Sequence, residues 1–161
     1  MPGPHPDWLR PEWPAPAHVH ALFTTRAGGA SQAPYHHLNL GDHVGDDPAA
    51  VQANRRVLQA ALESTTPGAR AVFLQQVHGA KVAALHAALP DGACADACLS
   101  TTPGLACTIM VADCLPVLLT DTQGTVVAAA HAGWRGLAGE GGVGVLEAVF
   151  KDFSALALAG K

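Results

Sequence analysis

Short apolar runs recur along the chain, and glycine, proline or polar residues separate them. Three of these runs lead to a side chain that can bind a metal: AVFLQQVH ends at His78, CTIMVAD precedes Cys114, and TVVAAAH ends at His131. Runs this short, rich in small and β-branched residues, are typical of buried strands. We therefore predict three strands whose ends carry His78, Cys114 and His131.

Two further strands follow from the same pattern, at residues 18–26 (HVHALFTTR) and 116–121, while the run that leads to Cys114 spans residues 105–112. The sequence DTQG at 121–124 is a turn signal, so the strand at 116–121 forms a hairpin with the run that ends at His131. Pro116 cannot donate a ladder hydrogen bond, which favours a bend that directs Cys114 out of the sheet.

Two helices are predicted. The first begins near Asp46 or Asp47, because aspartate is a good N-cap and Pro48 is tolerated in a first turn. Its apolar stripe consists of Val51, Leu58 and Leu62. Asn54 and Arg55 fall on the same stripe, so the guanidinium must find an anion or carbonyl groups there. The second helix is predicted within residues 143–153.

Composition narrows the class of protein. The 161 residues are 49% hydrophobic but only 5% aromatic, so the core must consist mainly of Ala, Val and Leu. The formal net charge of −4 argues against a basic surface that binds nucleic acid. The sequence also has no cluster of Lys and Arg that would indicate binding to a membrane surface. No apolar stretch reaches the length of a membrane span.

The proline-rich residues 1–17 are predicted to form an extended lead-in, and residues 18–161 a single catalytic-type domain. The first residues lack the charged-then-apolar pattern of a secretory signal, so we expect a cytoplasmic protein with reduced thiols. Cys94 and Cys98 have no second pair at finger spacing, which argues against a structural zinc knuckle.

His78, Cys114 and His131 lie 36 and 17 positions apart, so only the fold could assemble them into one site. Two imidazoles and one thiolate suit zinc or copper, with a fourth position open for chemistry. The alternative is ordinary: the histidines satisfy core or loop hydrogen bonds, and Cys114 acts as a small hydrophobe. Flanking glycine, proline and charged residues favour the site.

Other candidates surround this set. Arg26, Arg55 and Arg135 could hold phosphate or carboxylate in two-point geometry, although each alone could be a solvated or capping arginine. Asp96 and Asp113 are candidate carboxylates for orienting a ligand or moving a proton. A further histidine group could form a second metal site or simply a polar loop; it comprises His36, His37 and His43.

Six segments occur here in one order: TTRAGGAS, YHHLNLGDHVGDDPAAVQANRR, FLQQVHG, ADA, VADCLPVLL and HAGWRG. Together they resemble the multicopper polyphenol oxidase (laccase-like) family, whose bacterial members are also described as zinc-dependent purine nucleoside phosphorylases and as peptidoglycan editing factors. The resemblance runs from about residue 18 to 150. It implies an α/β (α+β) fold in which helices flank mixed β-sheets.

The resemblance also implies an activity: phosphorolysis of adenosine, inosine and methylthioadenosine with phosphate as co-substrate, together with deamination of adenosine. It implies zinc ligands His78, Cys114 and His131, with copper (Cu²⁺) as the alternative metal. The catalytic residues would then be Cys114, Asp113 and Arg135, and the substrate- and phosphate-binding residues would be Arg26, Asn39, Arg55 and Gln76.

Three rival functions stay open. The first is an amidase acting on cell-wall precursors, with Cys114 as nucleophile and His131 as base. The second is copper-dependent oxidation of phenols, although the ligand set does not resemble a blue-copper site. The third is an inactive metal-binding domain, because family members are usually longer and this chain stops near the helix after HAGWRG, which predicts a missing C-terminal third.

Overall fold

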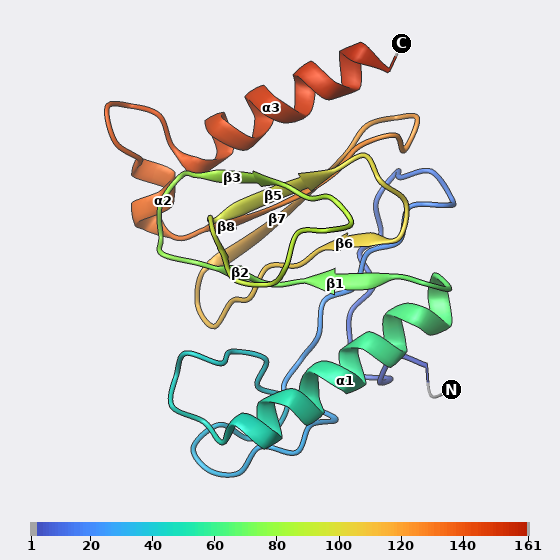
Figure 1. Ribbon diagram of the computed structural model, residues 1–161, viewed down its shortest axis with the longest axis vertical. Coiled ribbons are helices and arrows are strands. Elements are labelled where there is room, and N and C mark those ends of the chain that lie inside the picture. Colours follow the sequence, from blue (N-terminus) through green and yellow to red (C-terminus); the bar gives the residue numbers. More distant parts are fainter. Residues whose placement is uncertain (1–2, 161) are drawn as a thin grey trace. The chain divides into compact units, whose positions relative to one another are not determined.

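The computed structural model describes residues 3–160 and has an α+β fold of small mixed sheets and helices (Figure 1). The chain forms two compact units. The first takes in the residues up to Pro14 and His20–Arg70, and the second takes in Ala15–Val19 and the residues from Ala71 on. Among the described residues, no helix is both long and apolar enough to cross a bilayer.

The predicted fold class is confirmed, since small parallel and antiparallel sheets occur together with helices. The predicted division into residues 1–17 and 18–161 remains a prediction, and residues 1, 2 and 161 within those bounds lie outside the described part. Within the lead-in, Trp8 is buried and its indole donates to the Ala27 carbonyl at 3.1 Å.

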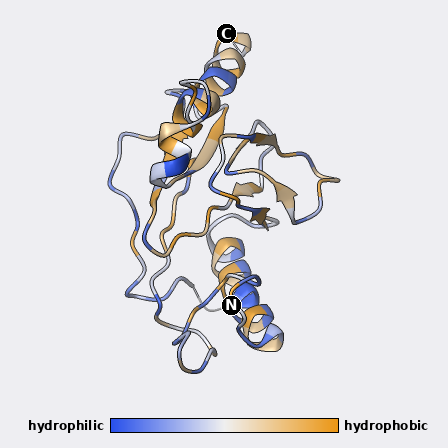
Figure 2. Ribbon diagram, turned by 90° about the vertical axis from the view of Figure 1, so that its left-hand side faces the viewer, coloured by the Kyte–Doolittle hydropathy of each residue, from blue (hydrophilic) through white to orange (hydrophobic). Residues whose placement is uncertain are grey.

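The first unit contains α1 (Pro48–Thr65), which confirms the predicted helix. The side chain of Asp47 caps it by accepting a hydrogen bond from the Ala49 N–H at 2.9 Å. Its buried face consists of Val51, Asn54, Leu58 and Ala61. Hydrophilic and hydrophobic positions alternate along the ribbon of α1 (Figure 2), as expected of a helix with one buried side.

The strand predicted over residues 18–26 is wrong. That segment makes one isolated bridge, between Leu9 and Phe23. Further along it, the Arg26 carbonyl accepts hydrogen bonds from the N–H groups of His37 and Leu38, at 3.2 and 2.9 Å. A strand needs a partner along its whole length, whereas here the backbone is paired with a folded loop.

The second unit is built on a four-stranded sheet with the order β3-β5-β8-β7. The strands are β3 (Val82–Ala84), β5 (Ala97–Ser100), β8 (Val127–Ala132) and β7 (Leu115–Thr120). β3 and β5 are parallel, and the other neighbours are antiparallel. β7 and β8 form the predicted hairpin around the turn at 121–124, and Pro116 lies in the edge strand β7, where proline is tolerated.

Both faces of the two central strands are buried. One face of β5 and β8 packs against α3 (Val145–Ala159), the helix predicted within 143–153. On the opposite face, Cys98 and Ala129 pack against Val72 and Leu74. Four of the six β8 residues are alanine, and such small side chains allow layers to approach from both sides. The predicted Ala/Val/Leu core is thereby confirmed.

Two predicted strands are shorter than expected. The run to His78 divides into β1 (Arg70–Val72) and β2 (Leu74–Gln75), which pair with β6 (Leu105–Cys107) and β4 (Ala93–Cys94) respectively. Between β1 and β2, the Phe73 N–H donates to the Asp91 carboxylate and its carbonyl accepts from Gly92. After β6, the Gln76 side-chain amide donates to the Met110 carbonyl at 2.7 Å and accepts from the Met110 N–H at 2.8 Å. At both places the side chains of Asp91 and Gln76 bind backbone groups that a neighbouring strand would otherwise bind, so the strands are short.

Candidate metal centre

The register of the sheet assembles the site at the end of β8. Ala97 of β5 pairs with Ala130 of β8, so the next antiparallel pair is Asp96 with His131. The His131 N–H donates to the Asp96 carbonyl at 2.7 Å, which continues the ladder by one step. His131 lies one residue before the end of β8 and is 4% exposed. The strand pairing therefore fixes Asp96 beside His131.

On the other side of β8, the pairing with β7 places Cys114 at the site. Leu115 pairs with Ala132, so Cys114 comes opposite Gly133. A Cβ atom added at Gly133 would lie 2.8 Å from the Cys114 sulfur and 3.3 Å from Cδ2 of His78. The missing side chain is what leaves room for both groups. Cys114 thus precedes β7, whereas the sequence pattern predicted it at the end of a strand over 105–112, which stops at Cys107.

His78 reaches the same place from a bend three residues after β2. Its φ of 61° lies in the left-handed region, which a residue other than glycine rarely adopts. The N–H groups of Val77, His78 and Gly79 all donate to the carboxylate of Asp96, at 3.1, 2.8 and 2.8 Å. Consecutive N–H groups directed at one anion hold this bend in place.

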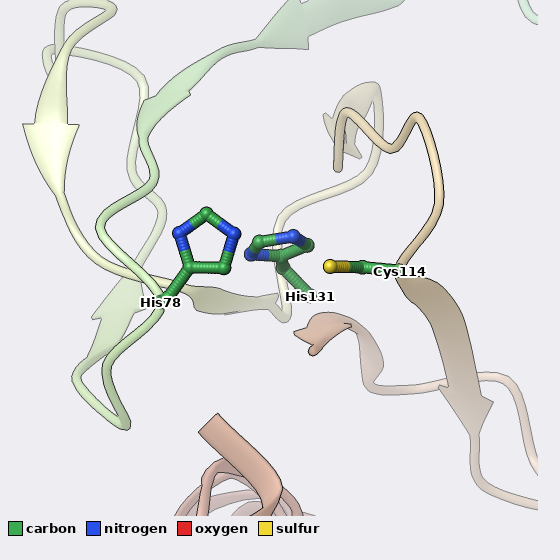
Figure 3. Close-up of side chains that lie close together, drawn as sticks. All are labelled: His78, Cys114 and His131. Atoms are coloured by element: carbon green, nitrogen blue, oxygen red, sulfur yellow. The ribbon is translucent and has the colours of Figure 1, made fainter. Parts of the chain in front are cut away.

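The ligand atoms of His78, Cys114 and His131 lie within 4.8 Å of one another. The imidazole rings meet edge to face with 4.7 Å between centroids. Figure 3 shows the sulfur of Cys114 directed at His131, with His78 on the far side of that ring. His78 is exposed, Cys114 is half-buried and His131 is buried.

These donors fit a divalent metal ion of the zinc type. Tetrahedral zinc binds nitrogen and sulfur at about 2.0–2.3 Å, which sets its ligand atoms roughly 3.5 Å apart. A contraction of about 1 Å in the widest donor separation would close the present arrangement around an ion. Within residues 3–160, this is the one group of three or more histidine, cysteine or carboxylate side chains gathered closely enough.

Asp96 is fully buried and accepts four hydrogen bonds. Three come from the backbone of residues 77–79, and the fourth comes from Nδ1 of His131 at 2.8 Å. Burial by itself raises the pKa of this carboxyl, but the bonds from His131 and the backbone outweigh it and lower the pKa below its ordinary value. Asp96 is therefore ionised, and the expected contact between this carboxylate and the ring of His131 is present.

The thiol of Cys114 experiences the opposite shift. Partial burial raises its pKa, and the negative charges of Asp113 and Asp96 raise it further. Asp113 is exposed, with its Oδ1 3.7 Å from the sulfur. A cation coordinated by the sulfur would reverse this effect, because a metal stabilises the thiolate.

The remaining candidates of the second unit make other contacts. Arg135 is exposed in α2 (Trp134–Ala138), with its guanidinium carbon 5.1 Å from the centroid of a Trp134 ring. The Gln76 amide is engaged with the backbone of Met110. This contact ties the segment before His78 to the segment before Cys114. Substrate roles for Arg135 and Gln76 stay predictions.

The other three candidates belong to the first unit. Arg55 finds the partners that its position demanded: its Nε donates to the Leu40 carbonyl at 2.9 Å, and its guanidinium pairs with Asp42 at 3.3 Å. The Asn39 amide donates to Gly41 and to Asp46, and Arg26 is exposed. Their predicted phosphate- and substrate-binding roles stay predictions.

The histidine group at residues 36, 37 and 43 does not form a second metal cluster among the described residues. All three side chains are exposed. The polar-loop interpretation is the one that fits. Cys94 is exposed and Cys98 is buried, and both are free thiols.

Sequence reasoning missed two features of the site. The need for Gly133 follows from the β7–β8 register, and the left-handed backbone of His78 follows from its contacts with Asp96. Asp96 itself left a signal: a lone carboxylate within the small apolar segment ACADACL is expected to be buried with partners.

Fold and site define a protein that can hold one divalent metal ion through two imidazoles and a thiolate. The chain belongs to the multi-copper polyphenol oxidoreductase laccase family, whose model matches residues 20–159. It is 57% identical over 141 residues to a protein of Pseudomonas aeruginosa named purine nucleoside phosphorylase, and 49% identical over 144 residues to the purine nucleoside phosphorylase YfiH of Escherichia coli.

These matches cover 88% and 89% of this chain but only 54% and 56% of those relatives, so the chain spans about half their length. Among solved structures, Neisseria meningitidis protein NMB0706 superposes with a TM-score of 0.82 at 48% identity, covering 91% of this chain and 57% of that one. YlmD from Geobacillus stearothermophilus gives 0.70 at 36% identity, covering 82% and 52%.

Proposed function

We propose that the chain carries the zinc centre of a purine nucleoside phosphorylase that acts on adenosine, inosine and methylthioadenosine and also deaminates adenosine. The observation that carries this proposal is the convergence of His78, Cys114 and His131 in a chain 57% identical to a relative of that name. We propose further that the protein is cytoplasmic and that its partners are small molecules, a purine nucleoside and phosphate.

In phosphorolysis, a phosphate oxygen attacks C1′ of the ribose, the bond from C1′ to the purine nitrogen breaks, and the purine leaves with a proton. A divalent ion at the site would supply positive charge for polarising a bound oxygen or the departing purine. Arg135, in the same unit as the three metal-type side chains, is the side chain proposed to bind phosphate. Asp113, exposed beside the cysteine, is proposed to pass the proton.

Deamination requires water at C6 of adenosine and releases ammonia. The same ligand set supports it, because two imidazoles and one thiolate leave a coordination position open for a water molecule. The site would then serve two reactions of one substrate class, with phosphate or water as the second reactant.

A hydrolase is the second candidate, and one specific observation favours it. The Asp96 carboxylate accepts from Nδ1 of His131, and the sulfur of Cys114 is directed at the same ring. This order of acid, imidazole and thiol is that of a cysteine nucleophile activated by an oriented base. His78 separates the two candidates, since a metal ion needs it and a nucleophilic triad does not.

The test uses Cys114→Ala and His78→Asn, the latter chosen because asparagine tolerates the left-handed region that His78 occupies. We expect both variants to lose zinc and the phosphate-dependent release of hypoxanthine from inosine. Cys94→Ala is the matched control, because it removes an exposed thiol outside the cluster. Full zinc and unchanged phosphorolysis in Cys114→Ala would refute the proposal. Hydrolysis of a cell-wall precursor that survives in His78→Asn but not in Cys114→Ala would favour the hydrolase with its Asp96–His131–Cys114 triad.

A further inference from the structure

We infer that Asp96 is the positioning residue of the metal centre, holding one histidine ligand by its ring and the other by its backbone. The inference rests on the proposed metal function and deepens it. One carboxylate reaches both: Oδ1 accepts from Nδ1 of His131 and from the His78 N–H, each at 2.8 Å. It does not itself belong to the ligand set.

The contact with His131 selects which ring nitrogen binds the metal. A carboxylate can only accept a hydrogen bond, so Nδ1 of His131 must carry the proton. In a neutral imidazole the remaining lone pair is then on Nε2. His131 therefore binds through Nε2, and the ring cannot turn over without breaking a fully buried hydrogen bond.

The contact with His78 acts on the main chain. Three consecutive N–H groups, from Val77 to Gly79, surround the carboxylate while His78 takes its φ of 61°. A backbone conformation of this kind persists only where its surroundings over-determine it. Asp96 supplies those surroundings, so the direction in which the exposed His78 side chain leaves the bend depends on a buried residue.

A purely structural carboxylate provides the comparison. Asp121, in the β7–β8 turn, accepts from the Thr125 N–H, the Thr125 hydroxyl and the Val126 N–H. It lies in the same unit and makes a similar number of bonds, but at the opposite end of β8 from His131, and none of its partners is a metal ligand. Asp121→Asn therefore controls for the loss of a bonded carboxylate as such.

The first measurement is metal affinity, by titration of purified protein with Co²⁺ and competition with Zn²⁺. In Asp96→Asn, one amide oxygen cannot serve four donors, and the new NH₂ group opposes at least one of them. We expect affinity to fall by about 10–100-fold and the cobalt–thiolate absorption to change. We expect Asp121→Asn to lower the melting temperature but to keep affinity and spectrum. Affinity within twofold of the parent in folded Asp96→Asn would overturn the inference.

The second measurement needs no variant and therefore remains informative if Asp96→Asn does not fold. Long-range ¹H–¹⁵N correlation spectra of the parent chain report the tautomer of each histidine. We expect His131 to be protonated at Nδ1, both without metal and with zinc bound through Nε2. Zinc on Nδ1, or a proton on Nε2, would refute the inference. A parent chain that shows the expected tautomer but binds no zinc would instead refute the proposed function.

Discussion

Two buried hydrogen-bond networks, one centred on Asn54 and one on Asp96, differ in whether they include a group that could bind something else. In the first unit, Asn54 is fully buried; its oxygen accepts from the Ala30 N–H, and its NH₂ group donates to Ser31 and to the carbonyls of His37 and Asn39. Every partner belongs to the loop that the asparagine folds. We call this network closed because its onward contact, from the Ser31 hydroxyl, ends on the Asp46 carboxylate, and none of these groups belongs to the metal cluster.

The Asp96 network is open by comparison. Asp96 accepts from three backbone N–H groups, and its fourth partner is Nδ1 of His131. The second nitrogen of that ring is not bound by Asp96, and the sulfur of Cys114 is directed at the same ring (Figure 3). A closed network only stabilises a conformation, whereas an open one also leaves a ring nitrogen available to a metal ion or a substrate. The chemistry of this chain is therefore expected where a buried network has a free end.

The largest expected effect breaks the closed network. Asn54→Ala leaves several buried donors and acceptors without partners, and each costs roughly 1–3 kcal/mol, so we expect the free energy of unfolding to fall by about 3 kcal/mol. Urea unfolding followed by circular dichroism measures this change. Zinc binding at temperatures where the variant is folded should be unaffected, and a loss of zinc there would contradict the separation of the two networks.

A second substitution obstructs the free end of the open network. In Gly133→Ala, the new Cβ would lie 2.8 Å from the Cys114 sulfur, and overpacking of this kind costs about 1–3 kcal/mol. We expect zinc affinity to fall roughly tenfold or more, measured by competition with a chromophoric chelator. Gly79→Ala is the matched control, because its Cβ would meet the nearest atom, Asp96 Oδ2, at an ordinary 3.6 Å.

A third substitution sets the scale for one hydrogen bond outside either network. The exposed Asp47 carboxylate accepts from the Ala49 N–H alone at the start of α1. Asp47→Ala should lower the free energy of unfolding by about 1 kcal/mol. A loss as large as that of Asn54→Ala, in the same urea assay, would mean that the closed network is worth no more than a helix cap.

The smallest effect concerns pH. Hydrogen bonds from Ser31 and Asn39 hold the pKa of Asp46 below its ordinary value of 3.8. A carboxyl with a lowered folded-state pKa stabilises the fold above pH 3.8, and this stabilisation is lost as the pH falls through the folded-state pKa. Asp46→Asn should therefore flatten the acid side of the stability profile, measured by urea midpoints from about pH 5 downward. An unchanged slope would contradict this role.

Much of the site could be predicted because its ligands are local signals: His78, Cys114 and His131 each follow or end an apolar run. The helix at Pro48–Thr65 was predictable because its cap, proline and stripe lie within one segment. Register is different. That Asp96 faces His131, and Cys114 faces Gly133, depends on pairings between strands distant in sequence. The failed strand over residues 18–26 shows the same limit, since its partner is a loop.

The exposure of the three ligands falls from His78 through Cys114 to His131. For a bound ion, this gradient sets the order in which bonds break during exchange. We expect His78 to leave first because water and chelators would reach it directly, Cys114 to follow, and His131, which is buried and hydrogen-bonded to Asp96, to leave last. Exchange of a bound ion would then proceed from one side, beginning at the bend that carries His78.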